Sequence, residues 1–355
     1  MSGKNIYQRE KQAGLIRRQF LRLAAGTLGA AAVLPFANWT SVYAEDAPVL
    51  TYAPPASLGR IATWGVEIRP KPSLEGKLVR IAQRDEVIKL LGQCVGTPVM
   101  PHNDIWYQTD DGYAYSSWIQ PVEDIKNLAE PEKAAEKFWG EITVPFSDSR
   151  WQPDPRAARY MRLYYTAVFR VVEAVTGKDG QWWYRLQDGI TWSPGPYVPA
   201  AHIRRIDPSE LTPISSDVTD KRVEVNLKEQ TITAYENGSP VLTARVSSGF
   251  GVHATPSGEH TVLYKSPASR MTGGVGADFY DLPGVPFPTF ITLSGVAIHG
   301  TYWHNDFGRP RSHGCLNAQS PVARWFWRWT LPSAPYDDVI YRTPKEVKGT
   351  LVKVA

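Results

Sequence analysis

Cysteine is scarce in this chain of 355 residues, which contains only Cys94 and Cys315. So few cysteines exclude a scaffold held together by disulfides, and stability must come from hydrophobic cores. Thirteen Trp and seventeen Tyr residues supply material for such cores, and they also suit sugar-binding clefts. Cys94 lies in an apolar, strand-like stretch and is expected to be a small buried residue. A Cys94–Cys315 disulfide is the alternative.

Basic patches are also missing, except at the N-terminus. The chain has a formal net charge of +4, but residues 1–44 hold six basic side chains against one acidic side chain. The remaining residues are therefore close to neutral, at about −1. Without a basic face, the sequence gives no reason to expect a nucleic-acid partner.

The longest apolar run, residues 23–36, is shorter than a transmembrane helix needs. It follows residues 17–22 (RRQFLR), which resemble the twin-arginine export motif, and residues 42–44 (VYA) offer small side chains for cleavage before Glu45. Residues 1–44 are therefore expected to be an export signal that contacts the membrane only transiently. This places the protein in the cell envelope, the periplasm or the extracellular face of the cytoplasmic membrane. An uncleaved membrane anchor is the alternative.

Long helical periodicities are scarce too, whereas Pro and Gly are frequent, so the chain predicts a mainly β fold. We expect a first module at 57–124, a linker at 125–156, a second module at 157–213 and a C-terminal domain at 217–345. Within the linker, residues 130–139 predict a short helix and residues 145–155 an irregular stretch.

The two modules repeat one pattern, in which an aromatic strand precedes an Asp-Gly turn. It reads IWYQTDDG at residues 105–112 and WWYRLQDG at residues 182–189. Residues 178–180 predict a further hairpin turn. Both modules resemble the small SH3-like β-barrels of exported bacterial cell-wall proteins, and two unrelated hairpins are the alternative. They are expected to anchor or orient the C-terminal domain, which is expected to fold and react by itself from about Asp217.

The C-terminal domain is expected to be β-rich. Residues 222–227 alternate as a strand, Asn237-Gly238 predicts a hairpin turn, and residues 294–298 predict a buried strand. Apolar side chains at i, i+3, i+4 and i+7 predict a helix at 321–329. The chain is expected to turn into the start of a helix between Ser312 and Cys315.

The most informative segment is residues 299–317 (HGTYWHNDFGRPRSHGCLN). A cysteine is a strong nucleophile as a thiolate, and a nearby imidazole can take its proton. Glycines next to Cys315 let backbone N–H groups approach a substrate carbonyl. Zinc ligation by His299, His304, His313 and Cys315 is a second interpretation, although no Cys-x-x-Cys or His-x-x-x-His spacing supports it. A purely structural cysteine is the third.

This segment resembles the signature of the L,D-transpeptidase catalytic domain, also called YkuD. That signature is His-Gly, a variable stretch, then Ser/Thr-His-Gly-Cys-apolar-Asn or -Arg. Here His299-Gly300 and residues 312–317 fill every fixed position. Residues 230–236 are similar to an early strand hairpin of that family, and residues 246–258 to its "VSTG…TPTG" segment. The resemblance covers roughly residues 217–343.

The resemblance implies acyl transfer on peptidoglycan stem peptides, which serve as donor and acceptor, without a metal or other cofactor. Cys315 is the implied nucleophile, His299 the general base and acid, His313 an orienting or oxyanion residue, and Gly314 a backbone oxyanion donor. Further residues are expected to support the site or to bind substrate. The supporting residues are Ser312, Asn317 and Gly300, and the substrate-binding residues are Tyr280, Trp303, His304, Arg309 and Arg311.

The implied reaction releases D-alanine from tetrapeptide stems and forms 3–3 cross-links through a cysteine thioester. Carbapenem-type inhibitors are expected to acylate the same thiol. Water as acceptor gives an L,D-carboxypeptidase, and a protein acceptor gives an enzyme that attaches proteins to peptidoglycan. A non-catalytic wall-binding protein is an alternative of another class.

Overall fold

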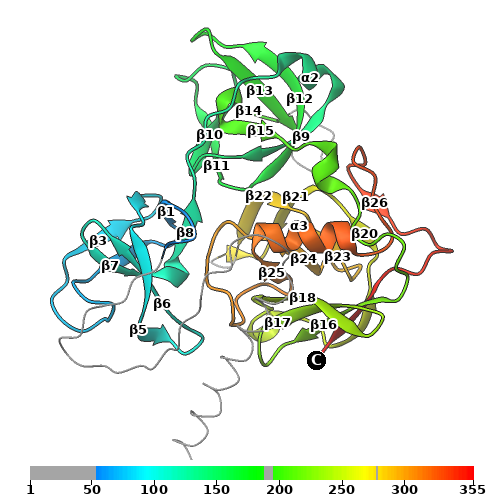
Figure 1. Ribbon diagram of the computed structural model, residues 1–355. Coiled ribbons are helices and arrows are strands. Elements are labelled where there is room, and N and C mark those ends of the chain that lie inside the picture. Colours follow the sequence, from blue (N-terminus) through cyan, green and yellow to red (C-terminus); the bar gives the residue numbers. More distant parts are fainter. Residues whose placement is uncertain (1–52, 188–194, 277–278) are drawn as a thin grey trace, which may run out of the picture.

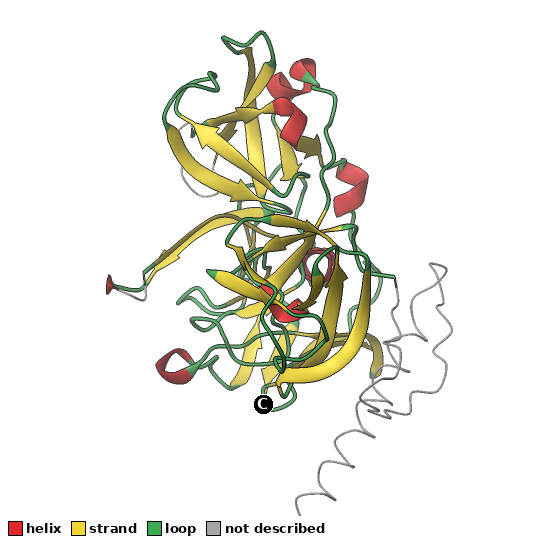
Figure 2. Ribbon diagram, turned by 90° about the vertical axis from the view of Figure 1, so that its left-hand side faces the viewer, coloured by secondary structure: helices red, strands yellow, loops and turns green. Residues whose placement is uncertain are grey.

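The computed structural model describes residues 53–187, 195–276 and 279–355. The expected export signal and the Asp188-Gly189 turn lie outside these residues. Strands dominate the described chain and the helices are short, which confirms the mainly β prediction (Figure 2). Among the described residues, no helix has the length and apolar character to span a membrane. In Figure 1 the second module lies above the C-terminal domain, and the first module lies to one side.

The first module contains two three-stranded sheets, ordered β4-β1-β8 and β5-β6-β7, and the β2-β3 hairpin. Its elements are β1 (Leu58–Ile61), β2 (Gly65–Ile68), β3 (Arg80–Gln83), β4 (Val87–Lys89), β5 (Gly92–Met100), β6 (Asn103–Thr109), β7 (Gly112–Tyr115), the 3-10 turn η1 (Ser116–Trp118) and β8 (Ile119–Val122). Cys94 is 1% exposed and packs with Trp106 and Tyr115, as predicted for a small buried residue. Both cysteines are free, so the disulfide alternative is wrong.

The second module contains one seven-stranded sheet, ordered β11-β10-β14-β13-β12-β9-β15. Its elements are α2 (Pro131–Glu136), β9 (Phe138–Ile142), β10 (Phe146–Arg150), β11 (Arg159–Tyr164), β12 (Val168–Thr176), β13 (Trp182–Gln187), β14 (Tyr197–Pro199), η2 (Ala200–His202), β15 (Ile203–Arg205) and η3 (Pro208–Leu211). Antiparallel pairing of β12 with β13 confirms the hairpin turn at 178–180. The likeness of either module to SH3 domains stays a prediction.

Part of the expected linker belongs to this sheet. The short helix is present as α2, but it ends before Phe138, where β9 begins. The irregular stretch expected at 145–155 was wrong in part, because β10 occupies Phe146–Arg150 and pairs with β11 and β14. The buried Ser147 and Ser149 of β10 gave no apolar alternation from which a strand could be predicted.

The C-terminal domain holds two five-stranded sheets, ordered β18-β17-β16-β27-β19 and β25-β24-β23-β20-β26, and the β21-β22 hairpin. Its elements are β16 (Lys221–Asn226), β17 (Thr231–Glu236), β18 (Ser239–Arg245), η4 (Gly251–His253), β19 (Gly258–Thr261), β20 (Tyr264–Lys265), β21 (Ala268–Gly273), β22 (Tyr280–Pro286), β23 (Thr289–Phe290), β24 (Ala297–Gly300), β25 (Leu316–Ala318), α3 (Ser320–Trp329), β26 (Tyr341–Arg342) and β27 (Leu351–Val354). The predicted strand at 222–227, the Asn237-Gly238 hairpin and the helix at 321–329 are confirmed as β16, β17–β18 and α3.

The second module and the C-terminal domain share a hydrophobic core. Trp139 of β9 is fully buried and packs in one cluster with Phe287 and Trp327 of the C-terminal domain. Its indole nitrogen donates to the carbonyl oxygen of Tyr336 over 2.8 Å. Separating the two parts would expose large apolar side chains on both sides. This shared core argues against the expectation that residues from Asp217 onward fold by themselves.

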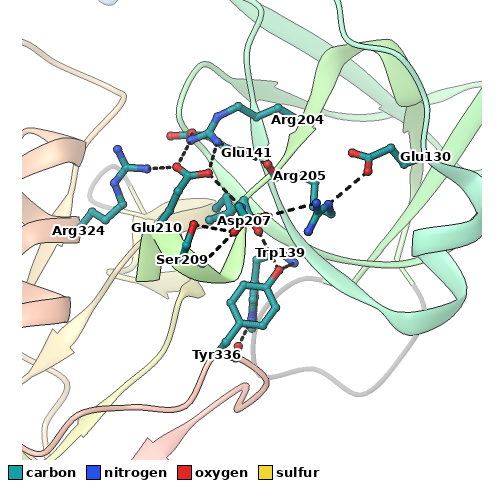
Figure 3. A network of polar contacts seen from close by, with 11 residues as sticks. Glu130, Trp139, Glu141, Arg204, Arg205, Asp207, Ser209, Glu210, Arg324 and Tyr336 are labelled. Atoms are coloured by element: carbon teal, nitrogen blue, oxygen red, sulfur yellow. Dashed lines mark hydrogen bonds and ion pairs between the residues drawn. The ribbon is translucent and has the colours of Figure 1, made fainter. Parts of the chain in front are cut away.

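Ion pairs cover the same junction (Figure 3). Glu210 of η3 accepts a hydrogen bond of 2.8 Å from Arg204 of β15 and one of 2.9 Å from Arg324 of α3. Arg204 also pairs with Glu141 of β9. A single carboxylate therefore joins the sheet of the second module to the helix of the C-terminal domain.

Replacing Trp139 by alanine is expected to lower the free energy of unfolding by about 3–5 kcal/mol, because it opens a cavity in the shared core. Trp182→Ala is the matched control, since this tryptophan of β13 is 42% exposed. This control variant should lower the free energy of unfolding by less than about 1 kcal/mol. Urea unfolding followed by fluorescence measures both. Equal effects of the two variants would show that the junction does not support the fold.

Candidate active site

His299 lies in β24, which has β25 on one side and β23 on the other. It is 2% exposed, and its Nδ1 atom lies 2.9 Å from the carbonyl oxygen of Gly300. A carbonyl oxygen only accepts hydrogen bonds, so Nδ1 carries the proton and Nε2 keeps its lone pair. Burial lowers the pKa of His299 to about 4, so the imidazole is uncharged at neutral pH. His299 can therefore accept a proton through Nε2.

Gly300 follows at a point of close packing. A Cβ atom there would lie 2.5 Å from Cγ of Pro286 and 3.0 Å from Cα of Ser320. Only glycine lets the chain pass between β22 and the start of α3 at this position. This placement agrees with the supporting role expected for Gly300.

Cys315 directly precedes β25, which runs parallel to β24. Ile298 pairs with Leu316, and His299 pairs with Asn317. Asn317 therefore lies beside His299, and Cys315 precedes it by two residues. The pairing of two short parallel strands brings the backbone next to Cys315 alongside β24, which carries His299.

The helix expected to start between Ser312 and Cys315 was wrong. Leu316 and Ala318 are fully buried, and their backbone pairs with β24 before α3 begins at Ser320. The apolar-polar-apolar alternation of residues 316–318 suits a strand, and Pro321 suits the first turn of the helix that follows. The cysteine is thus held at the start of a strand rather than at a helix N-terminus.

The environment of Cys315 disfavours the thiolate form of its side chain. Burial raises its pKa to about 11, and the backbone N–H of Ala297 opposes this only partly. Its S–H group lies 3.6 Å from the carbonyl oxygen of Gly295. The residue is nevertheless partly exposed, so a substrate can reach it. General-base catalysis by His299 would require a proton to move from this thiol to Nε2 when the sulfur attacks.

The loop before the nucleophile is fixed by its own side chains. The hydroxyl of Ser312 donates to the carbonyl oxygen of Cys315 and accepts the N–H of Gly314 over 3.1 Å. Gly314 has φ +115°, a conformation that favours glycine. Because its N–H is already engaged, the structure speaks against Gly314 as the backbone oxyanion donor. Ser312 holds the turn, in agreement with a supporting role.

This loop rests on the segment at 247–255. The carbonyl oxygen of Ser248 accepts the N–H groups of both Arg311 and Ser312, over 2.7 Å and 2.9 Å. The hydroxyl of Thr255 donates to the carbonyl oxygen of Gly314 over 2.8 Å and accepts the N–H of Gly249. The two sequence segments singled out separately, 246–258 and 312–317, are therefore one hydrogen-bonded unit.

His313 lies at the exposed rim of the site. Its ring centroid is 4.9 Å from that of Tyr280 and 4.7 Å from that of His253. The pKa of Tyr280 is raised, first by burial and then by the charge of the Cys315 thiolate. The same two causes raise the pKa of Tyr264. Tyr280 therefore lies close to the nucleophile as predicted, whereas His253 and Tyr264 were missed because no motif marks them.

His304 does not line the cleft. It is 2% exposed, and both its ring nitrogens have protein partners. Nδ1 accepts the N–H of Asp306 over 3.1 Å, and Nε2 lies 3.0 Å from the side-chain amide of Asn317. A substrate-binding role for His304 is thus contradicted, because its polar atoms are engaged below the surface. His304 and Asn317 instead connect the insert after His299 to the strand after Cys315.

Arg309 and Arg311 share one partner. Both donate to the same oxygen of Asp306, over 2.6 Å and 2.7 Å, and His102 of the first module lies 2.6 Å from the other oxygen. Burial would raise the pKa of Asp306, but hydrogen bonds from His102 and Arg309 hold it well below its usual range. The two arginines are therefore anchored to a fully buried carboxylate. This leaves them less suited to binding a substrate carboxylate than the sequence suggested.

The zinc interpretation is disfavoured by the geometry of its own ligand candidates. The ring nitrogens of His304 are engaged, and Nδ1 of His299 donates to a carbonyl. In the described part of the chain, no three His, Cys, Asp or Glu side chains gather in a way that could hold a metal ion.

Trp303 packs against the core of the second module, with its ring 5.7 Å from that of His299.

Alkylation of Cys315 by iodoacetamide is expected to accelerate about tenfold per pH unit from pH 7 to 10, because the thiolate is the reactive form and the pKa is about 11. The Cys94→Ala variant supplies a background with one thiol. In urea, the same thiol should titrate near the ordinary cysteine value of about 8.5. A plateau below pH 9 in the folded protein would instead indicate a preformed thiolate–imidazolium pair.

Comparison with known proteins supports the resemblance. Residues 220–354 match the family model of the L,D-transpeptidase catalytic domain, YkuD. No curated protein matches the chain. Among solved structures, a mutant of Enterococcus faecium L,D-transpeptidase is 25% identical over 39% of this chain and 50% of its own, with a TM-score of 0.31. This chain thus spans about half the length of that relative.

Two further structures are more distant. Mycobacterium tuberculosis L,D-transpeptidase 3, in complex with a faropenem-derived adduct, is 17% identical over 49% of this chain and 90% of its own, with a TM-score of 0.30. The LD transpeptidase LdtMt1, in complex with imipenem, is 16% identical over 71% and 90%, with a TM-score of 0.31. At these TM-scores the likeness carries no weight for the whole chain. The family match, however, covers the cysteine, the histidine and the strands that pair them, so residues 220–354 constitute an L,D-transpeptidase catalytic domain of the YkuD family.

Proposed function

We propose that this protein is a cysteine acyltransferase that acts on peptidoglycan stem peptides. One observation carries the proposal. Within a matched L,D-transpeptidase domain, β25, which begins directly after Cys315, pairs in parallel with β24, which carries His299 with an unprotonated Nε2. An accessible thiol beside a neutral imidazole is the arrangement required for general-base-assisted nucleophilic attack.

The steps follow from this pair. The sulfur of Cys315 attacks the carbonyl carbon of the third stem residue while Nε2 of His299 takes the thiol proton. The C–N bond to the terminal D-alanine then breaks, and the leaving amine receives that proton. The product is a thioester on Cys315. An acceptor amine attacks the thioester carbonyl, gives up a proton through His299 and restores the thiol. The backbone N–H of Cys315 is the proposed oxyanion donor, since that of Gly314 is bonded to Ser312.

The acceptor defines the outcome. An amine of a neighbouring stem gives a 3–3 cross-link, water gives a shortened stem, and a protein amine gives attachment to the wall. We take the stem amine as the acceptor, in line with the family match. The proposed place of action is the cell envelope, reached through the export signal at 1–44, which lies outside the described residues. Carbapenem-type inhibitors are expected to occupy Cys315, in line with the complexes of two structural neighbours with imipenem and with a faropenem-derived adduct.

The test is to incubate the protein with a disaccharide-tetrapeptide and to analyse the products by mass spectrometry. Loss of one alanine together with a cross-linked dimer supports the proposal. Loss of alanine without a dimer assigns the water reaction. A chelator should leave the rate unchanged, since both steps use only Cys315 and His299. No change in the substrate, together with binding to peptidoglycan sacculi, would favour the non-catalytic wall-binding alternative.

A further inference from the structure

The segment at 301–306 connects the two catalytic candidates to the rest of the molecule. It leaves β24 directly after His299 and Gly300, and it contacts both N-terminal modules before the chain returns to Cys315. These contacts join residues up to 242 positions apart in the sequence.

The second module receives the aromatic part of this segment. Tyr302 is 1% exposed and belongs to the hydrophobic core of the second module rather than to that of its own domain. Its ring stacks on Tyr164 of β11 with centroids 5.7 Å apart, and its hydroxyl donates to the carbonyl oxygen of Pro283 over 2.6 Å. The neighbouring Trp303 packs against the same core. The segment is thus inserted between β22 and the second module.

The first module holds the backbone of the same residue. Arg60 of β1 donates through its guanidinium to the carbonyl oxygen of Tyr302 over 2.7 Å. Arg60 is 2% exposed, and its other two nitrogens donate to Gln120 and Asp85, Nε over 3.1 Å and Nη1 over 2.9 Å. Burial lowers the pKa of Arg60, and the charge of Asp85 opposes this. A buried cation is costly unless it is fully paired, and here one of its partners belongs to the C-terminal domain.

Three residues further on, the first module contacts the segment again. The side-chain amide of Asn305 donates to the carbonyl oxygen of Ser116 over 3.2 Å. Asp306, which is fully buried, lies 2.6 Å from Nε2 of His102, in the turn between β5 and β6. The carbonyl oxygen of His102 in turn accepts a hydrogen bond of 2.8 Å from Arg245 of β18. The turn carrying His102 is therefore fastened to the C-terminal domain from two sides.

The residues between these anchors contact His299 and the strand that follows Cys315. The ring of Trp303 lies 5.7 Å from the ring of His299. His304 lies 3.0 Å from the side chain of Asn317, which is paired with His299 and follows Cys315 by two residues. A shift of the segment would therefore move both the packing of the general base and the support of the nucleophile strand.

We propose that Arg60 and His102 of the first module are positioning residues of the active site, which hold the segment at 301–306 so that Trp303 and His304 fix the relative placement of His299 and Cys315. This inference rests on the proposed function. It assigns to the first module a part in the chemistry of the C-terminal domain, without contact to the substrate. A misplacement of reacting groups by about 1 Å can cost about 10²-fold in rate, so loss of these contacts should be visible in the chemical step.

The test uses the full chain and the variants Arg60→Lys and His102→Ala. Arg60→Lys keeps the charge beside Asp85, but an ammonium cannot bind Gln120 and the carbonyl of Tyr302 with the same planar fork. Acylation of Cys315 by imipenem is followed by stopped-flow absorbance at increasing concentrations, which separates the maximal rate from half-saturation. Each variant should lower the maximal rate by about 10–100-fold with little change in half-saturation. Circular dichroism and urea unfolding establish how much of each variant is folded.

Arg80→Ala is the matched control. Arg80 also pairs with carboxylates, but both partners, Glu86 and Asp111, belong to the first module. This control should react at the wild-type rate. His102→Gln, which restores an N–H donor toward Asp306, should recover most of the rate lost in His102→Ala. A merely structural role would instead lower stability and leave the maximal rate per folded molecule unchanged.

The possible outcomes separate the inference from the function on which it rests. If the wild-type chain is acylated and folded Arg60→Lys and His102→Ala both react at its rate, the positioning role is overturned. If the wild-type chain is not acylated at Cys315, the proposed function fails first. A slow maximal rate that His102→Gln recovers supports the inference even when the alanine variant is less stable, because the rate is expressed per folded molecule.

Discussion

Cys315→Ala should abolish acyl transfer, with a loss of at least about 10³-fold, while the protein stays folded. The variant removes the sulfur atom that would form the thioester. The side chain is small and lies at a partly exposed position, so the packing around it changes little. Release of D-alanine from a tetrapeptide stem, measured by liquid chromatography, gives the rate.

Cys94→Ala is the matched control for this variant. Cys94 is a buried thiol whose pKa is also raised to about 11 by burial, but it lies in the first module beside Trp106. The control should retain the wild-type rate, with at most a modest loss of stability. Turnover that survives in Cys315→Ala and disappears in Cys94→Ala would contradict the assignment of the nucleophile.

His299→Ala should lower the rate of acylation by about 10²–10⁴-fold, the range typical of general acid–base groups. The thiol has a pKa of about 11 and the imidazole one of about 4, so neither is charged at pH 7 and the base must take the proton during attack. As the pH rises toward 11, the thiolate forms without help. The ratio of the wild-type acylation rate to that of His299→Ala should therefore decrease with increasing pH when imipenem is the acylating agent.

His313→Ala provides the comparison for the base. His313 lies at the exposed rim, where its ring contacts those of Tyr280 and His253. Its loss should act mainly on substrate binding. If His313→Ala lowers the acylation rate relative to the wild type and His299→Ala does not, the role of general base belongs to His313.

Much of the C-terminal domain could be predicted because its signals are local. Asn237 and Gly238 both adopt positive φ, at 48° and 80°, as the hairpin turn between β17 and β18 requires. The helix at 320–329 follows from its apolar spacing and its proline near the start. The motif with every fixed position filled predicted Cys315 and His299 as a catalytic pair, and the strand that follows Cys315 pairs with the strand that carries His299.

The structure differs from the sequence predictions at residues whose conformation depends on contacts with other parts of the chain. Residues 316–318 form a strand because β24 offers a parallel partner, which nothing in a three-residue segment reveals. His304 resembles a cleft residue in the sequence, but the insert folds inward and buries it against Asn317. Arg309 and Arg311 were expected near the substrate, yet Asp306, only a few residues away, binds both.

The contacts between the domains could not be predicted from the sequence. Arg60 and Tyr302 are 242 positions apart, and neither carries a motif. A resemblance limited to the C-terminal domain treats the preceding modules as attachments. The shared core around Trp139 and the buried Arg60 instead make them part of the structure that holds the site.

The most direct test of the account is to identify the residue that becomes acylated. The protein is mixed with imipenem or with a tetrapeptide-stem muropeptide, quenched, digested and mapped by tandem mass spectrometry. The account predicts one added acyl group, located on the peptide that contains Cys315 and absent from the Cys315→Ala variant. Acylation at Cys94 or at a lysine, or an unmodified Cys315 after complete turnover of the stem, would contradict it.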